Sequence, residues 1–437
     1  MSAFSAGLLN QRRQAAVFAL SAALLLGGGW AAYSSVVGSP EYRLGVAASN
    51  TFRNPGYNVT VSTQVSTEYM QAVAAGTDYA SMGLPGIQSA ADAAAAISNI
   101  SVTMARGSND VLNPNARFAV SYGKSTLLDF RIVKRTAYLR INPAVLAKQS
   151  PAILPAEALS MMRSELRTSV ARANKGKRVS PAMKSYNYRA LQLFDGKTVA
   201  MPFASNTAAG RKWNRLMRPA TNPQLTGVQQ ATAALMQALR ESLAGHTTVL
   251  DLGDDAVGDK MSVSFDVPGL MAALKTQLLE IARQQATASG ETWDESQESA
   301  SFDQSLAGVP ASLSADVWVS GDYIKQVEVD LAQFDDTANG VTLPAKGLVL
   351  RMVFNRGNVT APTKVMKMSA AESNIAMNSV GSSAMGFLAA ANSGIPLPLR
   401  LPAVGAQPSL PSIHELVVHT NQRALVWRDA LAGVVRP

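Results

Sequence analysis

The residues that could carry chemistry are few and widely spaced. The chain has no cysteine and only three histidines among 437 residues: His246, His414 and His419. Without cysteine, disulfides, thiolate metal sites and a cysteine nucleophile are excluded. No HExxH sequence occurs, and three scattered histidines do not form a zinc set. The sequence therefore predicts no metal centre and no cofactor.

Two short motifs match catalytic signatures only in part. In GDDAVGDK, residues 253–260, Asp259 stands where a phosphate-binding loop needs lysine, and neighbouring aspartates would repel phosphate. Ser121 to Lys124 fits SxxK, but the companion SDN and KTG elements are missing. Both stretches are interpreted as turns between strands, and the chain is predicted not to be an enzyme.

Strand patterns dominate from residue 57 onward. YNVTVSTQV, ISVTMAR, ARFAVSY, TLLDFRIV and TAYLRI alternate between turn signals and predict a meander of antiparallel strands. TTVLDLGDDAVGDKMSVSFDV predicts strand, turn and strand. Residues 316–331 predict another hairpin, in which Val317 and Val319 face one side and Gln326 and Glu328 the other.

Helical periodicity interrupts the strands three times: at 155–174, at 224–243 and from Pro268 onward. The predicted fold class is α+β: a curved antiparallel half-barrel with helices packed on its concave face, preceded by one N-terminal membrane-spanning or signal helix. The helices carry apolar stripes, which consist of Leu159, Met162, Leu166, Leu270, Leu274 and Leu278. These stripes line a ligand cavity, or they are the core of an unliganded domain.

The N-terminal segment indicates export. Arg12 and Arg13 precede an uncharged stretch over residues 15–37, which is either a cleaved signal or an uncleaved anchor. We divide the chain into this segment (1–37), a half-barrel domain (38–368) and a Ser/Ala- and Pro-rich tail (369–437). The predicted location is the extracytoplasmic side of the cell membrane, or outside the cell if the signal is cleaved.

Charge is distributed unevenly. Residues 131–218 contain 18 Lys/Arg and 3 Asp/Glu, whereas residues 251–336 contain 4 Lys/Arg and 17 Asp/Glu. The two segments neutralise each other, or the basic one meets anionic lipid head groups. In the second interpretation Arg163, Arg167 and Arg172, which lie off the apolar stripe, face the membrane. No nucleic-acid-binding motif is present.

Three stretches together resemble a known family. TTVLDLGDDAVGDKMSVSFDVPGLMAAL, LSADVWVSGDYIKQVEVDL and LVLRMVFNRGNVTAPTKV resemble, in that order, the C-terminal half of the LppX/LprG-type envelope proteins of actinobacteria. These proteins are similar in fold to the LolA/LolB lipoprotein carriers. The resemblance implies a half-barrel with a hydrophobic cavity for acyl chains. The lipidated cysteine of that family is absent here.

These observations give two main functional hypotheses; a third, an envelope enzyme, would need a polar cleft that converges on Ser121, Lys124 or a pair of carboxylates. The first is an exported, membrane-tethered protein that binds or transfers a lipid or an acylated glycolipid in a hydrophobic cavity. The second is a non-catalytic structural or assembly subunit of a cell-envelope complex, which has the same fold with a filled core and grips its partner through the tail. A large cavity favours the first hypothesis.

Overall fold

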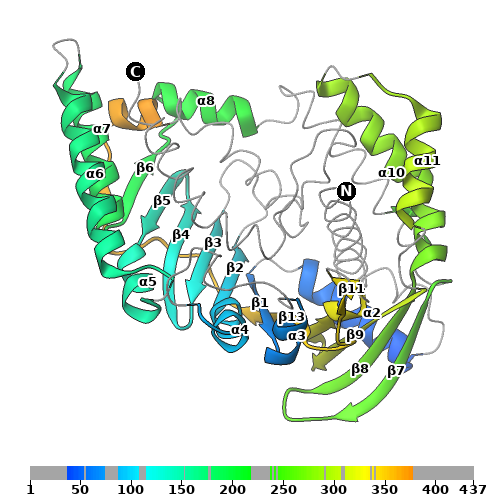
Figure 1. The fold of residues 1–437 in the computed structure, drawn as a ribbon. Helices are drawn as coiled ribbons and strands as arrows, with labels where there is room; N and C mark the ends of the chain where they lie inside the picture. The colour runs from blue at the N-terminus through cyan, green and yellow to red at the C-terminus, as the bar shows by residue number, and fades with distance from the viewer. Residues whose placement is uncertain are drawn as a thin grey trace. The chain divides into compact units, whose positions relative to one another are not determined.

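The computed structural model shows an α+β protein with a large, mostly antiparallel, open sheet (Figure 1). It describes residues 37–53, 56–73, 87–107, 115–151, 153–175, 179–217, 237–238, 241–242, 245–289, 292–306, 311–334, 337–338 and 341–376. None of the helices within these ranges is long and apolar enough to cross a membrane. The predicted signal or anchor, up to residue 36, lies outside them.

The chain divides into two compact units. Unit 1 contains residues 1–57, 219–355 and 389–412, and unit 2 contains residues 58–218, 356–388 and 413–437. Unit 1 therefore draws residues from the predicted half-barrel domain (38–368) and from the segments before and after it, whereas unit 2 draws residues from that domain and from the segment after it.

Unit 2 contributes seven strands in the order β14-β6-β5-β4-β3-β2-β1 (Figure 1). From β2 to β6 neighbouring strands are antiparallel, while β14 pairs with β6 in parallel. The strand bounds are β1 Tyr57–Val65, β2 Ile100–Arg106, β3 Ala116–Tyr122, β4 Ser125–Val133, β5 Thr136–Ile141, β6 Val199–Pro202 and β14 Met366–Lys367.

Helices of unit 2 occupy the connections between these strands. They are α3 Thr67–Val73, α4 Ala90–Ser98, α5 Pro143–Gln149, α6 Ala156–Asn174, α7 Pro181–Phe194 and α8 Ala208–Met217. Ser180 caps α7, since its side chain accepts a hydrogen bond from Met183 N. Helix α6 packs against α7, which in turn contacts β5 and β6.

Unit 1 contributes five antiparallel strands in the order β13-β10-β9-β8-β7. They are β7 Thr247–Asp254, β8 Asp259–Asp266, β9 Ser312–Ser320, β10 Tyr323–Asp330 and β13 Leu348–Arg356. A separate ribbon pairs β11 Thr337–Ala338 with β12 Val341–Thr342. The helical elements are α2 Pro40–Arg53, α10 Val267–Ser289, α11 Glu295–Leu306 and the short 3-10 helix η4 Leu331–Phe334.

The hairpin predicted over residues 316–331 is confirmed. Val317 pairs with Val327, and both are fully buried on one face of the sheet. Asp316 pairs with Glu328 on the opposite face, where Lys260 and Arg351 form ion pairs with them. The sheet of unit 1 thus has one packed and one polar face, as the alternation predicted.

Other sequence predictions have mixed outcomes. The strand pattern over residues 57–65 and 100–141 is confirmed, and GDDAVGDK forms the turn between β7 and β8. The helices predicted at 155–174 and from Pro268 correspond to α6 and α10. The one predicted at 224–243 falls mostly outside the described residues. Helices α2, α7 and α11 were not predicted.

Residues 369–376, which the sequence assigned to the tail, pack within unit 2. Ser369 and Glu372 exchange hydrogen bonds between their side chains and backbone N–H groups, forming a capping box at the start of a helical turn. The Glu372 side chain is only 4% exposed and forms an ion pair with Arg189 of α7. Ala376 joins a buried cluster with Tyr186, Val199 and Met368.

Candidate functional site

The candidate site is the apolar face of the unit 2 sheet, where alternate residues of β2, β3, β4 and β5 point to the same side and form cross-strand rows. One cross-strand row consists of Val102, Val120, Leu128 and Ile141. The next row consists of Met104, Phe118, Phe130 and Leu139. We call these eight residues the apolar face. Two aromatic rings at its centre give it a large hydrophobic area for its width.

The residues of the apolar face are half-buried rather than buried. A third row on the same side is more deeply buried, because Ala116, Ile132 and Ala137 are each 5% exposed or less. The sheet is therefore tightly covered at one end of β4 and less tightly covered along the two neighbouring rows. Large apolar side chains that keep part of their surface accessible commonly mark a binding surface.

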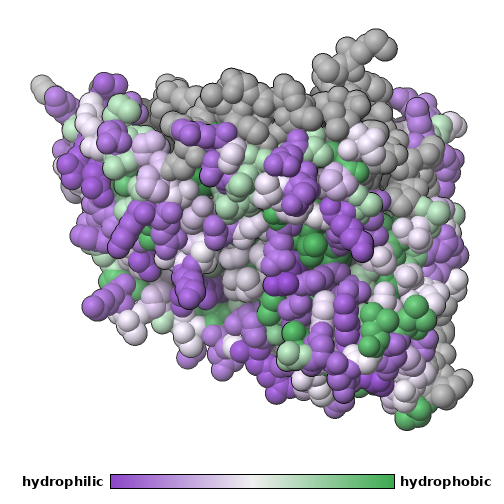
Figure 2. Space-filling model, turned by 60° about the horizontal axis from the view of Figure 1, so that its bottom comes forward, coloured by the Kyte–Doolittle hydropathy of each residue, from purple (hydrophilic) through white to green (hydrophobic). Residues whose placement is uncertain are grey.

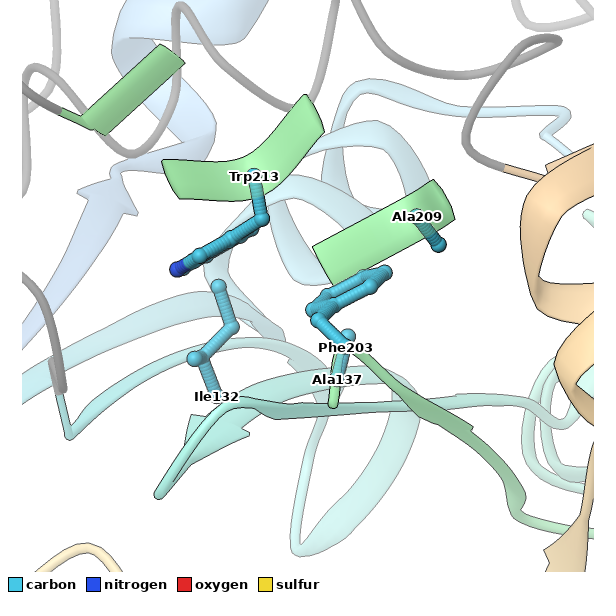
Figure 3. Close-up of a cluster of buried hydrophobic side chains, with 5 residues drawn as sticks. All are labelled: Ile132, Ala137, Phe203, Ala209 and Trp213. Atoms are coloured by element: carbon cyan, nitrogen blue, oxygen red, sulfur yellow. The ribbon is translucent and has the colours of Figure 1, made fainter. Parts of the chain in front are cut away.

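Helix α8 provides the tight cover at the third row (Figure 3). Trp213, which is 1% exposed, stacks on Phe203 with ring centroids 4.9 Å apart and an interplanar angle of 11°. Both rings lie over Ile132 and Ala137, and Phe130 packs against the edge of the cluster. Leu139 pairs with Val199, whose side chain lies in the cluster formed with Tyr186 of α7. Helices α7 and α8 thus lie on the same side of the sheet as the apolar face.

One charged residue lies among these three rows. Arg106 pairs with Ala116 in the third row, and burial lowers the pKa of its guanidinium below the ordinary value. A guanidinium remains protonated at neutral pH despite such a shift, because it is a very weak acid. The apolar side of the sheet therefore has a cationic end next to the Met104 row.

The reverse side of the same strands is polar. Asp129 of β4 accepts hydrogen bonds from Arg117 Nε at 3.0 Å and from Arg131 Nη2 at 2.6 Å. Burial alone would raise the pKa of Asp129, but the hydrogen bonds and charges of the two arginines outweigh burial and lower it. Arg140 lies opposite Asp129 on β5, and Tyr138 lies opposite Arg131. The strands therefore separate an apolar side from a cationic one.

The predicted cavity lining on α6 fills a contact between helices. Leu166 is 8% exposed and packs with Val170 and Phe194, the last residue of α7. Leu159 and Met162 are partly buried against the same cluster. This arrangement corresponds to the alternative in which the stripe is ordinary core.

The predicted lining on the third helix belongs to the other unit. Leu270 and Leu274 of α10 are 1% and 3% exposed, and Leu278 is half-buried. Helix α10 contacts β8 and β9 of unit 1. The apolar stripe of α6 therefore belongs to unit 2, and the stripe of α10 belongs to unit 1.

The three arginines predicted to face a membrane differ in their surroundings. Arg163 forms an ion pair with Asp195, with 2.8 Å between Nη2 and Oδ1. Arg167 and Arg172 are exposed on α6. Two of the three therefore remain available to anionic groups.

Within the described residues, no group of three or more histidine, aspartate or glutamate side chains could hold a metal ion. His246 lies 3.0 Å from Asp266, which also caps the first turn of α10 through Gly269 N. Ser121 is the last but one residue of strand β3, and Lys124 is exposed in the turn that follows.

Figure 2 shows a mainly hydrophilic surface on which hydrophobic residues form small separate groups. The exposed large apolar residues of the described chain include Leu250 and Leu252 on β7 and Val257 in the turn after it. Strand β7 stands at the end of the strand order. This edge carries both backbone hydrogen-bonding groups and apolar side chains.

Comparisons with family models, with curated proteins and with solved structures gave no significant match. Fold class and surface chemistry therefore carry the functional argument.

Sequence reasoning identified the strands of the apolar face but did not select the face as the site. Its signal was present, because the even-numbered residues of β2, β3 and β4 and the odd-numbered residues of β5 are mostly large and apolar. What the sequence did not fix was the cross-strand register, which aligns Met104, Phe118 and Phe130 in one row.

Proposed function

We propose that the chain is an exported, membrane-tethered protein that binds the acyl chain of a lipid or acylated glycolipid against the apolar face of its unit 2 sheet. The half-barrel curvature and the N-terminal anchor predicted from the sequence belong to this proposal. The observation that carries it is the pair of adjacent rows of large apolar side chains that remain half-buried on the side where α7 and α8 lie.

The energetics of such binding need no catalytic residue. Each methylene transferred from water to an apolar surface contributes about 0.8 kcal/mol when it is fully buried. Two rows across four strands are wide enough for an extended chain, since neighbouring strands lie about 4.8 Å apart.

A second candidate function, a structural or assembly subunit, is supported by strand β7. Leu250 and Leu252 are 57% and 55% exposed on an edge strand. Exposed edges accept a further strand from a partner chain, and apolar side chains add specificity. In this alternative the partner binds at unit 1, and the apolar face of unit 2 is core that needs no ligand.

The two functions differ in what the purified protein carries. We would extract the full-length protein from its own or a related host in a mild detergent, record native mass spectra, and identify lipids after organic extraction. The lipid-binding proposal expects one lipid class at near one-to-one stoichiometry. A bare protein mass from a folded preparation contradicts that proposal and leads to a search for a partner.

A pair of variants locates the ligand. Met104→Gln places a polar group of similar length on the apolar face and should lower lipid occupancy several-fold. Leu250→Gln makes a comparable change on the exposed strand of unit 1 and should leave lipid occupancy unchanged. If both variants retain the same lipid at the same occupancy, the apolar face is not the binding surface.

A further inference from the structure

The polar side of the unit 2 sheet contains a small pocket of about 70 Å³. It is lined by Asp129, Arg131, Tyr138, Arg140, Thr198 and Pro362. This side is opposite to the apolar face, because Asp129 and Arg131 alternate along β4 with Phe130 and Ile132. A site here is therefore separate from the proposed lipid surface and does not rest on it.

Arg131 is fully engaged by the protein. Its Nε and Nη2 donate to Asp129, and its Nη1 donates to the carbonyl oxygen of Thr360 at 3.1 Å. Asp129 also accepts a hydrogen bond from Arg117 Nε. The carboxylate is thus held between two arginines, and its depressed pKa keeps it ionised at neutral pH.

Arg140 is engaged at one nitrogen only. Its Nε donates to the carbonyl oxygen of Gly196 at 3.0 Å, which fixes the plane of the guanidinium. Within the described part of the chain, no residue accepts a hydrogen bond from its two terminal nitrogens, nor from the hydroxyls of Tyr138 and Thr198. Four donor groups of the pocket therefore have no protein acceptor there.

The charge of the pocket favours an anion. Arg117, Arg131 and Arg140 surround the single carboxylate of Asp129, which leaves an excess of positive charge. The terminal nitrogens of a guanidinium bind two oxygens of one anion in a bidentate manner. Two hydroxyls in addition suit an anion with more than two acceptor oxygens, which a phosphate group has and a carboxylate lacks.

We propose that this pocket is a phosphate-binding site, in which Arg140 contacts two phosphate oxygens and Tyr138 and Thr198 contribute hydroxyl donors. The pocket is large enough to hold one small oxyanion. The phosphate is either a free ion or the terminal group of a lipid head group.

Calorimetric titration of the full-length chain in neutral detergent, with inorganic phosphate as the probe, tests the site. We expect saturable binding of one phosphate per chain. Arg140→Gln should weaken it about tenfold or more, because a charge-assisted pair of hydrogen bonds is lost. Tyr138→Phe keeps the ring in place, removes one donor and should weaken binding several-fold, so the result does not depend on how well Arg140→Gln folds.

The matched control is Lys184→Gln, which removes one positive charge from the exposed surface of α7 in the same unit. It should leave phosphate affinity unchanged. The proposal is overturned if the wild-type chain shows no saturable phosphate binding, or if Lys184→Gln weakens binding as much as Arg140→Gln does.

Competition separates the two sources of phosphate. Dihexanoyl phosphatidic acid has a terminal phosphate. Dihexanoyl phosphatidylcholine has the same acyl chains, but its phosphate is esterified with choline and is not terminal. Displacement of bound phosphate by the first lipid alone supports a lipid head group. Retention of bound phosphate in the presence of both supports the free ion. Equal displacement by both lipids assigns the effect to their acyl chains and contradicts a phosphate-specific pocket.

Discussion

The two sheet segments follow the same alternating pattern but are covered differently. In unit 1 the apolar side is closed: Met261, Val317, Ile324 and Val327 have no measurable exposure. In unit 2 the corresponding side keeps Met104, Phe118, Phe130 and Leu139 half-buried. Alternation therefore determines which side is apolar, while the overlying helices determine whether that side is core or surface.

Their polar sides differ as well. In unit 1, Lys260 pairs with Asp316 and Arg351 pairs with Glu328, while Arg43 of α2 pairs with both Asp251 and Asp259. Unit 2 places several arginines around the single carboxylate of Asp129. Under the lipid-binding proposal, the unit 2 segment has both an apolar and a cationic surface available to ligands, whereas the packed face of the unit 1 segment contributes to stability.

The largest expected difference between the units is in the stability lost when a leucine of the apolar side is replaced by alanine. Leu313→Ala in unit 1 removes a side chain that is 1% exposed and should lower the free energy of unfolding by about 3 kcal/mol. Leu139→Ala in unit 2 makes the same chemical change at a half-buried position and should cost about 1 kcal/mol. Urea unfolding of lipid-free protein measures both values. Equal losses would mean that the apolar face of unit 2 is ordinary core.

The strands were predictable because a period of two is a local property. The bounds of β2, β3 and β5 coincide with the stretches ISVTMAR, ARFAVSY and TAYLRI. Helix α2 was missed because the residues it buries, such as Ala47 and Ala48, are small and give a weak stripe. Helix α7 was missed because it buries a polar residue, Asn187, within its apolar side.

The site was less predictable than the strands. Its rows depend on register, which the turns and the bulge near Val120 set across the strands. The stripe of Leu159, Met162 and Leu166 was visible in the sequence, but its partner Phe194 lies on a helix that was not predicted. A periodic stripe shows that a side chain will be covered and leaves open whether a helix or a ligand covers it.

The next effect concerns the buried carboxylate of unit 2. Asp129→Asn should lower the free energy of unfolding by about 2 kcal/mol at pH 7, since charge-assisted hydrogen bonds to Arg117 and Arg131 are lost. Glu328→Gln in unit 1 should cost about 1 kcal/mol or less, because its partner Arg351 is 35% exposed. Similar losses for the two variants would remove this distinction between the units.

The Asp129→Asn variant also changes how stability depends on pH. The pKa of Asp129 is lowered on folding, so its stabilisation is complete above the ordinary value of 3.8 and is lost as the pH falls through the depressed folded value. Stability of the wild-type chain should therefore fall more steeply below about pH 3.8 than that of Asp129→Asn. Denaturant midpoints measured from pH 7 down to about pH 2 show whether the wild-type and Asp129→Asn curves converge.

The smallest expected effect is a change in the pKa of one carboxyl group, Asp255, in unit 1. Trp318 Nε1 donates to Asp255 Oδ2 at 2.6 Å, and Val257 N donates to Oδ1 at 2.7 Å. The indole hydrogen bond is the largest cause of the lowered pKa of Asp255, followed by the backbone bond. A neutral donor thus performs in unit 1 the role that arginines perform at Asp129.

Trp318→Phe should raise the pKa of Asp255 toward its ordinary value and leave the pKa of Asp129 unchanged. Titration followed by NMR of the carboxyl carbons measures both pKa values. If the pKa of Asp255 stays depressed in Trp318→Phe, the backbone donors of the turn are sufficient and the contrast between the polar sides rests on Asp129 alone.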